Sequence, residues 1–305
     1  MTLREARQFI ADYYNNPNPG EDDGFLFEEA SRFLIENYHD PRDMHDLAFF
    51  YLEHKRHDLE FKYLEMAASY DYPPAFEELG YIWYYGQNGE VDYEKAYGCF
   101  SKGASLEDDL VKVFCEVKLA DMYHNGYFVK KDEVKYHAMV EELYKVCMNP
   151  GQLYSVYSNP AECLPYADVF LRLAGIRSEE GKTDEALDLL SRARVRLADE
   201  IKWNPLWWGN IELMEETVTL QYELGGRPSV LDIYDLFSLA LEKCRLCFSY
   251  EGKPYFVEVV AEEDGTSLFF EGKWFRSPRD FFAKAQINGL KITYVYDKLD
   301  GFLVQ

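Results

Sequence analysis

The stretch Leu79-Gly80-Tyr81-Ile82-Trp83 decides the fold, because a degenerate copy follows 40 residues later as Leu119-Ala120-Asp121-Met122-Tyr123. The same offset relates three further pairs: Gly86 and Gly126, Asp92 and Asp132, and Lys95 and Lys135. An earlier copy occupies residues 47–51. A fixed period of this length predicts a solenoid of stacked helix pairs. Such solenoids present extended binding surfaces rather than a catalytic cleft.

Each copy predicts a helix, a turn and a second helix. In the first helix, Leu79 and Trp83 are four residues apart and share one face, where Trp83 is expected to lie in the core. The small residue after the leucine allows a neighbouring helix to approach closely. A glycine turn follows, and Asp92 then stands where an N-cap belongs, with its side chain accepting hydrogen bonds from free backbone N–H groups.

These residues resemble Sel1-like repeats, which are related to the tetratricopeptide repeat, most clearly over residues 44–148. The matching positions are Leu79, Gly80, Trp83, Gly86, Asp92, Ala96, Phe100, Lys102 and Ala104. The next copy departs from the pattern at residues 142–144, and the copy at 47–68 has a shorter turn. The resemblance implies an adaptor that binds proteins and carries out no chemistry.

Composition describes a folded, acidic chain. Its 305 residues are 48% hydrophobic, 29% charged and 17% aromatic, and the formal net charge is −23. Negative charge repels phosphate backbones and anionic membranes, so nucleic acid and lipid are disfavoured as partners of the solenoid. A basic protein or peptide is favoured instead, although the same charge would also keep an aromatic-rich chain soluble.

The charge is uneven along the chain, which predicts two domains. The balance is −20 over residues 1–230 and −3 over residues 231–305. A glycine-rich segment at 225–229 lies at the change. We therefore expect a mainly α protein, with an N-terminal α-solenoid at 1–228 and a small α+β domain with antiparallel strands at 229–305.

Alternating apolar residues predict strands in the second domain, at 244–250, 255–260, 267–270 and 273–275. Ser277-Pro278 predicts the start of a short helix that runs to about residue 286, because serine suits the N-cap and proline the first helical position. A helix is also expected at 231–242, and a last hairpin from residues 291–296 and 302–304.

The sequence contains no recognisable catalytic, cofactor or metal motif. Cys244 and Cys247 have the spacing of a metal knuckle, but no second Cys or His pair lies near them. The six cysteines are scattered, which is typical of reduced thiols in a cytoplasmic protein. The sequence has no run of about 18 apolar residues, so we expect no membrane-spanning helix. We expect no enzyme activity.

Two groups of residues are candidates for partner binding. Tyr84 and Tyr85 lie on the repeat surface, where tyrosine is a common interface anchor. Lys273, Arg276 and Arg279 form a basic cluster that could hold an anion or a nucleic-acid phosphate, or be ordinary surface charge.

The function expected from this pattern is that of a protein-interaction adaptor. One alternative is a nucleic-acid-related or enzymatic activity in the C-terminal module. Another is an antitoxin-like neutraliser of a basic protein.

Overall fold

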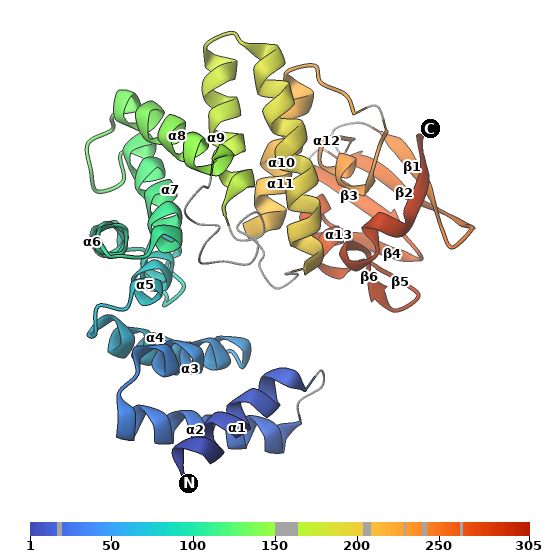
Figure 1. The fold of residues 1–305 in the computed structure, drawn as a ribbon. Coiled ribbons are helices and arrows are strands. Elements are labelled where there is room, and N and C mark those ends of the chain that lie inside the picture. Colours follow the sequence, from blue (N-terminus) through green and yellow to red (C-terminus); the bar gives the residue numbers. More distant parts are fainter. Residues whose placement is uncertain (17–19, 150–163, 204–208, 229, 240–242, 263–264) are drawn as a thin grey trace. The chain divides into compact units, whose positions relative to one another are not determined.

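The computed structural model describes residues 1–16, 20–149, 164–203, 209–228, 230–239, 243–262 and 265–305. The chain divides into two compact units. Unit 1 comprises residues 1–143 and 149–164, and unit 2 comprises residues 144–148 and 165–305. The predicted mainly α fold, with helix pairs followed by a small α+β region, is confirmed (Figure 1).

Unit 1 is a succession of helices that pack against their neighbours along the chain. Its elements are α1 (Leu3–Asn15), α2 (Glu21–Tyr38), α3 (Pro41–Glu53), α4 (His57–Ala68), α5 (Pro73–Tyr85), α6 (Tyr93–Ser105), α7 (Asp109–Asn125) and the greater part of α8 (Glu133–Met148).

The turn after α5 and the turn after α7 have the same geometry. Gly86 and Gly126 both take left-handed backbone conformations, with φ of 65° and 71°, which favour glycine. The N–H of Asp92 donates to the carbonyl of Trp83 at 3.0 Å, and that of Asp132 donates to Tyr123 at 2.9 Å. The two copies of the repeat therefore form the same turn structure, once after α5 and once after α7.

The predicted N-caps are present in both copies. The Oδ1 of Asp92 accepts from the backbone N–H of Lys95 at 3.0 Å, and Asp132 accepts from Lys135 at the same distance. Because each cap satisfies a backbone donor that has no intrahelical partner, it fixes where the second helix begins.

The small residue of the repeat allows α5 and α6 to touch. A Cβ added at Gly80 would lie 2.4 Å from Cε1 of Phe100, whose own side chain is fully buried. At the corresponding position of α7, Ala120 is also fully buried. The predicted close approach is thus a contact between the α5 backbone and an aromatic ring of α6.

Unit 2 joins three long helices to a five-stranded antiparallel sheet of order β4-β3-β2-β1-β7. The helices and 3₁₀ turns are α9 (Tyr166–Glu179), α10 (Thr183–Trp203), α11 (Gly209–Glu223), η3 (Ile233–Asp235), α12 (Leu236–Leu239), α13 (Pro278–Lys284), η4 (Ile292–Tyr294) and η5 (Tyr296–Lys298). The strands are β1 (Cys244–Tyr250), β2 (Lys253–Glu262), β3 (Gly265–Phe270), β4 (Lys273–Phe275), β5 (Gln286–Ile287), β6 (Leu290–Lys291) and β7 (Leu299–Val304).

One face of the sheet is buried and the other is not. On the buried face, Phe270 and Phe275 contact Phe281 of α13, with ring centroids 5.6 and 5.3 Å apart. The predicted Ser277 cap is present, because its Oγ accepts from the N–H of Asp280 at 3.1 Å.

The predicted final hairpin is wrong. Lys291 pairs with Gln286 in a separate two-stranded ladder, and β7 pairs with β1 at the edge of the main sheet. Residues 292–298 form two 3₁₀ turns instead of a strand. Ile292 and Val295 are both buried, and their spacing of three places them on one side of a 3₁₀ turn. Burial therefore overrides the strand preference of this segment.

The helix predicted at 231–242 is also different. The chain there forms a short 3₁₀ turn, η3, and the four-residue helix α12, while residues 240–242 lie outside the described residues. The compact units divide the described chain near residues 143–165 and not near residue 228. The two domains expected from composition, at 1–228 and 229–305, remain a prediction.

Candidate partner-binding surfaces

Tyr84 and Tyr85 lie at the C-terminal end of α5 and face α7. The Tyr85 side chain is 50% exposed, and its hydroxyl accepts a hydrogen bond from Nζ of Lys118 at 3.0 Å. The ring centroids of Tyr84 and Tyr85 are 4.9 Å apart in an edge-to-face arrangement. Tyr85 is therefore an exposed aromatic side chain whose position is fixed by its neighbours.

The ammonium of Lys118 is held in an aromatic surround. It lies 5.5 to 5.7 Å from the ring centroids of Tyr81, Tyr84 and Tyr85, and 3.5 Å from a carboxylate oxygen of Asp121. Only 7% of Lys118 is exposed. A lysine buried to this extent needs compensating contacts, which the rings and the carboxylate provide.

A second lysine–aromatic contact recurs with the repeat. Nζ of Lys95 lies 3.9 Å from the ring of Trp83, and Nζ of Lys135 lies 3.8 Å from the ring of Tyr123. Both residues of each pair are related by the 40-residue offset. Trp83 packs against the hydrophobic core around Phe100, as expected, but part of its side chain is exposed.

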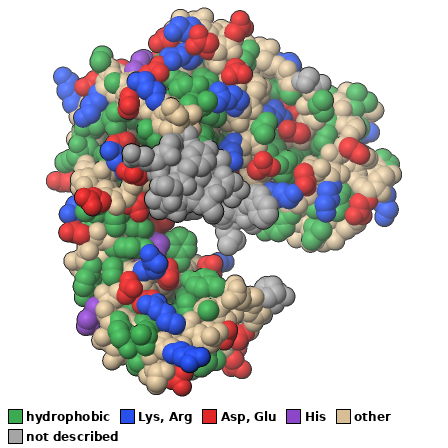
Figure 2. All heavy atoms as spheres, in the orientation of Figure 1, with side chains coloured by type: hydrophobic (Ala, Val, Ile, Leu, Met, Phe, Trp, Pro, Cys, Tyr) green, Lys and Arg blue, Asp and Glu red, His purple; other side chains and the backbone are tan. Residues whose placement is uncertain are grey.

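Trp83 borders a groove that the sequence did not reveal. The groove has a volume of about 460 Å³ and lies over α5, between α4 and α6. It is lined by Phe61, Glu65, Phe76, Leu79, Trp83, Lys95, Gly98 and Cys99. Figure 2 shows that hydrophobic side chains reach the surface of the protein among acidic and basic ones.

Two partly buried carboxylates lie on α5, the helix that forms the base of this groove. Burial raises the pKa of Glu78 to about 7, with His45 lowering it and Glu60 raising it further. Burial also raises the pKa of Glu77 well above its ordinary value. Both residues are on α5. We therefore expect the stability of unit 1 to depend on pH.

The structure divides the predicted C-terminal basic cluster. Arg279 donates to Glu212 at 2.9 Å and also to Glu215, both on α11. The bond to Glu215 is the main reason that the pKa of Arg279 is raised. Lys273, Arg276 and Arg279 are all exposed, but the charge of Arg279 is already engaged by two carboxylates.

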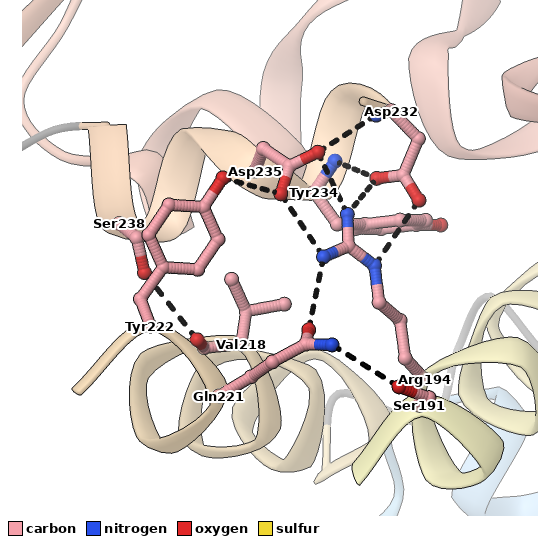
Figure 3. A network of polar contacts seen from close by, with 9 residues as sticks. All are labelled: Ser191, Arg194, Val218, Gln221, Tyr222, Asp232, Tyr234, Asp235 and Ser238. Carbon is pink, nitrogen blue, oxygen red and sulfur yellow. Dashed lines mark hydrogen bonds and ion pairs between the residues drawn. The ribbon is translucent and has the colours of Figure 1, made fainter. Parts of the chain in front are cut away.

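Unit 2 contains a buried polar network around Arg194 that sequence reasoning missed (Figure 3). The Arg194 guanidinium pairs with Asp232 at 2.7 Å and with Asp235 at 2.9 Å, and also donates to Gln221 at 3.3 Å. The Tyr222 hydroxyl donates to Asp235 at 2.8 Å. The network joins α10, α11 and η3.

The carboxylates of Asp232 and Asp235 favour the charged form of the Arg194 side chain. The Arg194 side chain is 7% exposed and that of Asp235 is fully buried. Burial lowers the pKa of Arg194, but the two carboxylates outweigh burial and raise it above its ordinary value. We interpret the network as structural, since the side chains of Arg194, Asp232, Asp235 and Gln221 each contact another of its members.

Within the described part of the chain, no group of three or more His, Cys, Asp or Glu side chains has the geometry of a metal site. Cys99, Cys115, Cys147, Cys244 and Cys247 carry free thiols. No helix in the described ranges is long and apolar enough to cross a membrane.

Comparison with known proteins gives structural similarity only. No protein-family model and no curated protein sequence matches the chain. A Sel1 repeat protein from Oxalobacter formigenes is similar at 18% identity and a TM-score of 0.38, with 75% of this chain and 94% of that protein covered. The antigen c5321 of uropathogenic Escherichia coli strains, which displays an SLR fold, is similar at 14% identity and a TM-score of 0.41. That match covers 78% of this chain and 58% of the antigen.

Proposed function

We propose that this protein is a cytoplasmic interaction adaptor that binds a protein or peptide through the helix pairs of unit 1. The observation that carries the proposal is the exposed, anchored Tyr85 beside Tyr84. The repeat residues Gly80, Gly86 and Asp92 form the architecture, whereas Tyr85 remains half exposed on it. An aromatic side chain that is already positioned loses little conformational freedom on binding.

The chemistry of the chain favours a basic partner. The net charge of −23 attracts a cationic protein and repels polyanions. Buried free thiols such as Cys115 and Cys147 fit a reducing compartment such as the cytoplasm. The proposed activity is binding without catalysis.

The test is affinity purification of the tagged full chain, followed by reciprocal capture of each candidate partner. Tyr85→Ala is the test variant, and Tyr70→Ala is the matched control, because Tyr70 is similarly exposed at 51% on the same unit. We expect Tyr85→Ala to weaken partner binding by about tenfold or more, with unchanged circular dichroism. Equal binding by both variants would remove Tyr85 from the proposal.

A second candidate function has its own observation in unit 2. Trp274 and Phe256 are 62% and 42% exposed on the sheet face opposite α13. The guanidinium of Arg245 lies 4.5 Å from the Phe256 ring on that face. Aromatic side chains on an open sheet, with exposed Lys273 nearby, favour stacking of single-stranded nucleic acid bases.

Fluorescence anisotropy of the full chain with a labelled single-stranded oligonucleotide tests this second function. We expect binding that weakens with salt and is lost in Trp274→Ala. Arg276→Ala should weaken it more than Arg279→Ala, because Arg279 is already paired with Glu212. Absence of binding at low salt would eliminate this function.

A further inference from the structure

The groove over α5 is lined partly by positions of the repeat and partly by side chains that differ between the copies. Its residues Leu79 and Lys95 recur 40 residues later as Leu119 and Lys135, as structural positions of the repeat should. Trp83 likewise recurs as the aromatic Tyr123, and the edge-to-face contact of Phe61 with Trp83 has a counterpart in that of Tyr97 with Tyr123. Two positions of the lining differ at the 40-residue offset: Glu116 replaces Phe76, and Ala138 replaces Gly98.

Gly98 leaves space on the α6 side of the groove. It lies in the interior of α6, where glycine is less favourable than alanine by about 1 kcal/mol. A Cβ built at Gly98 meets no atom within 4 Å, so packing does not require glycine there. The same helix contains Gly103, where a Cβ would lie 2.8 Å from Sγ of Cys115 and packing does require it.

The floor of the groove is a tryptophan held in place from two sides. The Lys95 ammonium covers the Trp83 ring at 3.9 Å, and Phe61 meets that ring edge-on with centroids 5.4 Å apart. Lys95 also pairs with Asp92 at 3.3 Å, so its charge is compensated. The floor is therefore an aromatic surface prepared to receive an apolar side chain.

The rim of the groove carries one carboxylate that is not compensated. Glu65 is exposed on α4, and within the described ranges its carboxylate has no ion-pair partner. By contrast, Asp71 near the same helix pairs with Lys102 at 2.8 Å. The electrostatics of the rim are thus complementary to a cation placed next to an apolar anchor.

We propose that this groove binds a peptide segment of a partner protein in which a bulky apolar side chain is followed by a lysine or arginine. The apolar side chain lies on Trp83 and Phe61, and the cation meets Glu65. This inference rests on the proposed function, protein binding, but assigns it a second site that is separate from the Tyr85 surface.

Four short labelled peptides in a Gly-Ser background test the proposal by saturation-transfer nuclear magnetic resonance and anisotropy. Their central pairs are Phe-Arg, Phe-Glu, Ala-Arg and Ala-Glu. We expect the Phe-Arg peptide to bind the full chain best, with about tenfold weaker binding when Phe is replaced by Ala. Replacing Arg by Glu should weaken binding several-fold.

Variants of the protein locate the binding. Gly98→Leu fills the groove and should weaken binding of the Phe-Arg peptide by about tenfold or more. The matched control is Gly175→Leu in α9, where an added Cβ also meets nothing within 4 Å. Glu65→Gln should reduce the preference for Arg over Glu and leave the preference for Phe over Ala unchanged.

Three results would overturn the proposal: absence of binding by all four peptides, equal binding by wild type and Gly98→Leu, and equal loss in Gly175→Leu. Sedimentation of wild type and Gly98→Leu tests for a second copy in the groove, and a dimer lost only in Gly98→Leu would overturn it as well. If the Tyr85-dependent partner is still captured while these peptides fail, only this inference fails.

Discussion

Replacement of Arg194 by methionine is expected to produce a large loss of stability in unit 2. Methionine keeps much of the arginine stem but removes the donors to Asp232, Asp235 and Gln221. The fully buried Asp235 carboxylate would then keep only the Tyr222 hydroxyl at 2.8 Å and the Asp232 N–H at 2.7 Å. Breaking a buried ion pair by removing one partner typically costs about 3–5 kcal/mol, and we expect a loss in that range.

The assay is urea unfolding followed by circular dichroism, together with hydrogen exchange of the α11 amides. Arg192→Met is the control, because Arg192 is on the same helix but is 36% exposed and lies 3.7 Å from Asp188. An exposed pair of this kind contributes about 0.5 kcal/mol. Exchange should therefore accelerate along α11 in Arg194→Met and change little in Arg192→Met.

A double-mutant comparison isolates the uncompensated carboxylate. Adding Asp235→Asn to Arg194→Met removes the buried negative charge, so part of the lost free energy of unfolding should return. A loss below about 1 kcal/mol in Arg194→Met alone would refute the reasoning. Further destabilisation of Arg194→Met by Asp235→Asn would refute it also.

Three further outcomes follow from the helix pairs of unit 1. In thermal unfolding, Gly80→Ala should destabilise the protein by about 1–3 kcal/mol, because the new methyl group would overlap the Phe100 ring. Gly98→Ala should stabilise the protein by about 0.5–1 kcal/mol, because an added Cβ there meets no atom within 4 Å. A change of the same sign in both variants would show that packing does not distinguish these glycines. Asp92→Ala should cost about 1 kcal/mol through loss of the α6 cap, and a neutral result by urea unfolding would contradict the cap. Because burial raises the pKa of Glu78 from its ordinary 4.5 to about 7, the stability that it contributes is fully present below pH 4.5 and is lost as pH rises through 7. Glu78→Gln should flatten this dependence by about 1–2 kcal/mol across that window, and an unchanged slope of stability against pH would exclude Glu78 as its source.

The parts of the fold that the sequence predicts are those set by neighbouring residues. The glycine turns at Gly86 and Gly126, the cap at Asp92 and the Ser277 cap each depend on contacts within about one helical turn. Their residue types therefore carry the signal directly. The close approach at Gly80 was predicted for the same reason, since a small residue in a repeated apolar pattern marks a contact.

The parts that the sequence missed depend on residues brought together from distant segments. The groove needs Phe61, Trp83 and Gly98 from three helices, and none of them is unusual alone. The Arg194 network joins residues 27 to 41 positions apart, and charged residues on an amphipathic helix resemble a solvated face. The incorrect prediction of a hairpin at 291–296 and 302–304 also has a long-range cause, because β7 pairs with the distant strand β1.

The turn of each helix pair has a consequence for how the chain can change in length. All the contacts that define a turn, from Trp83 to Lys95 in one copy and from Tyr123 to Lys135 in the next, lie within a short stretch. Removing residues 86–125 would join Tyr85 directly to Gly126 and bring Lys135 into the place of Lys95. We therefore expect that a unit of 40 residues can be deleted or duplicated while the turn contacts at its ends are kept. The step from Leu47 to Leu79 is only 32 residues, so a unit of another length is accommodated where the turn itself is shorter.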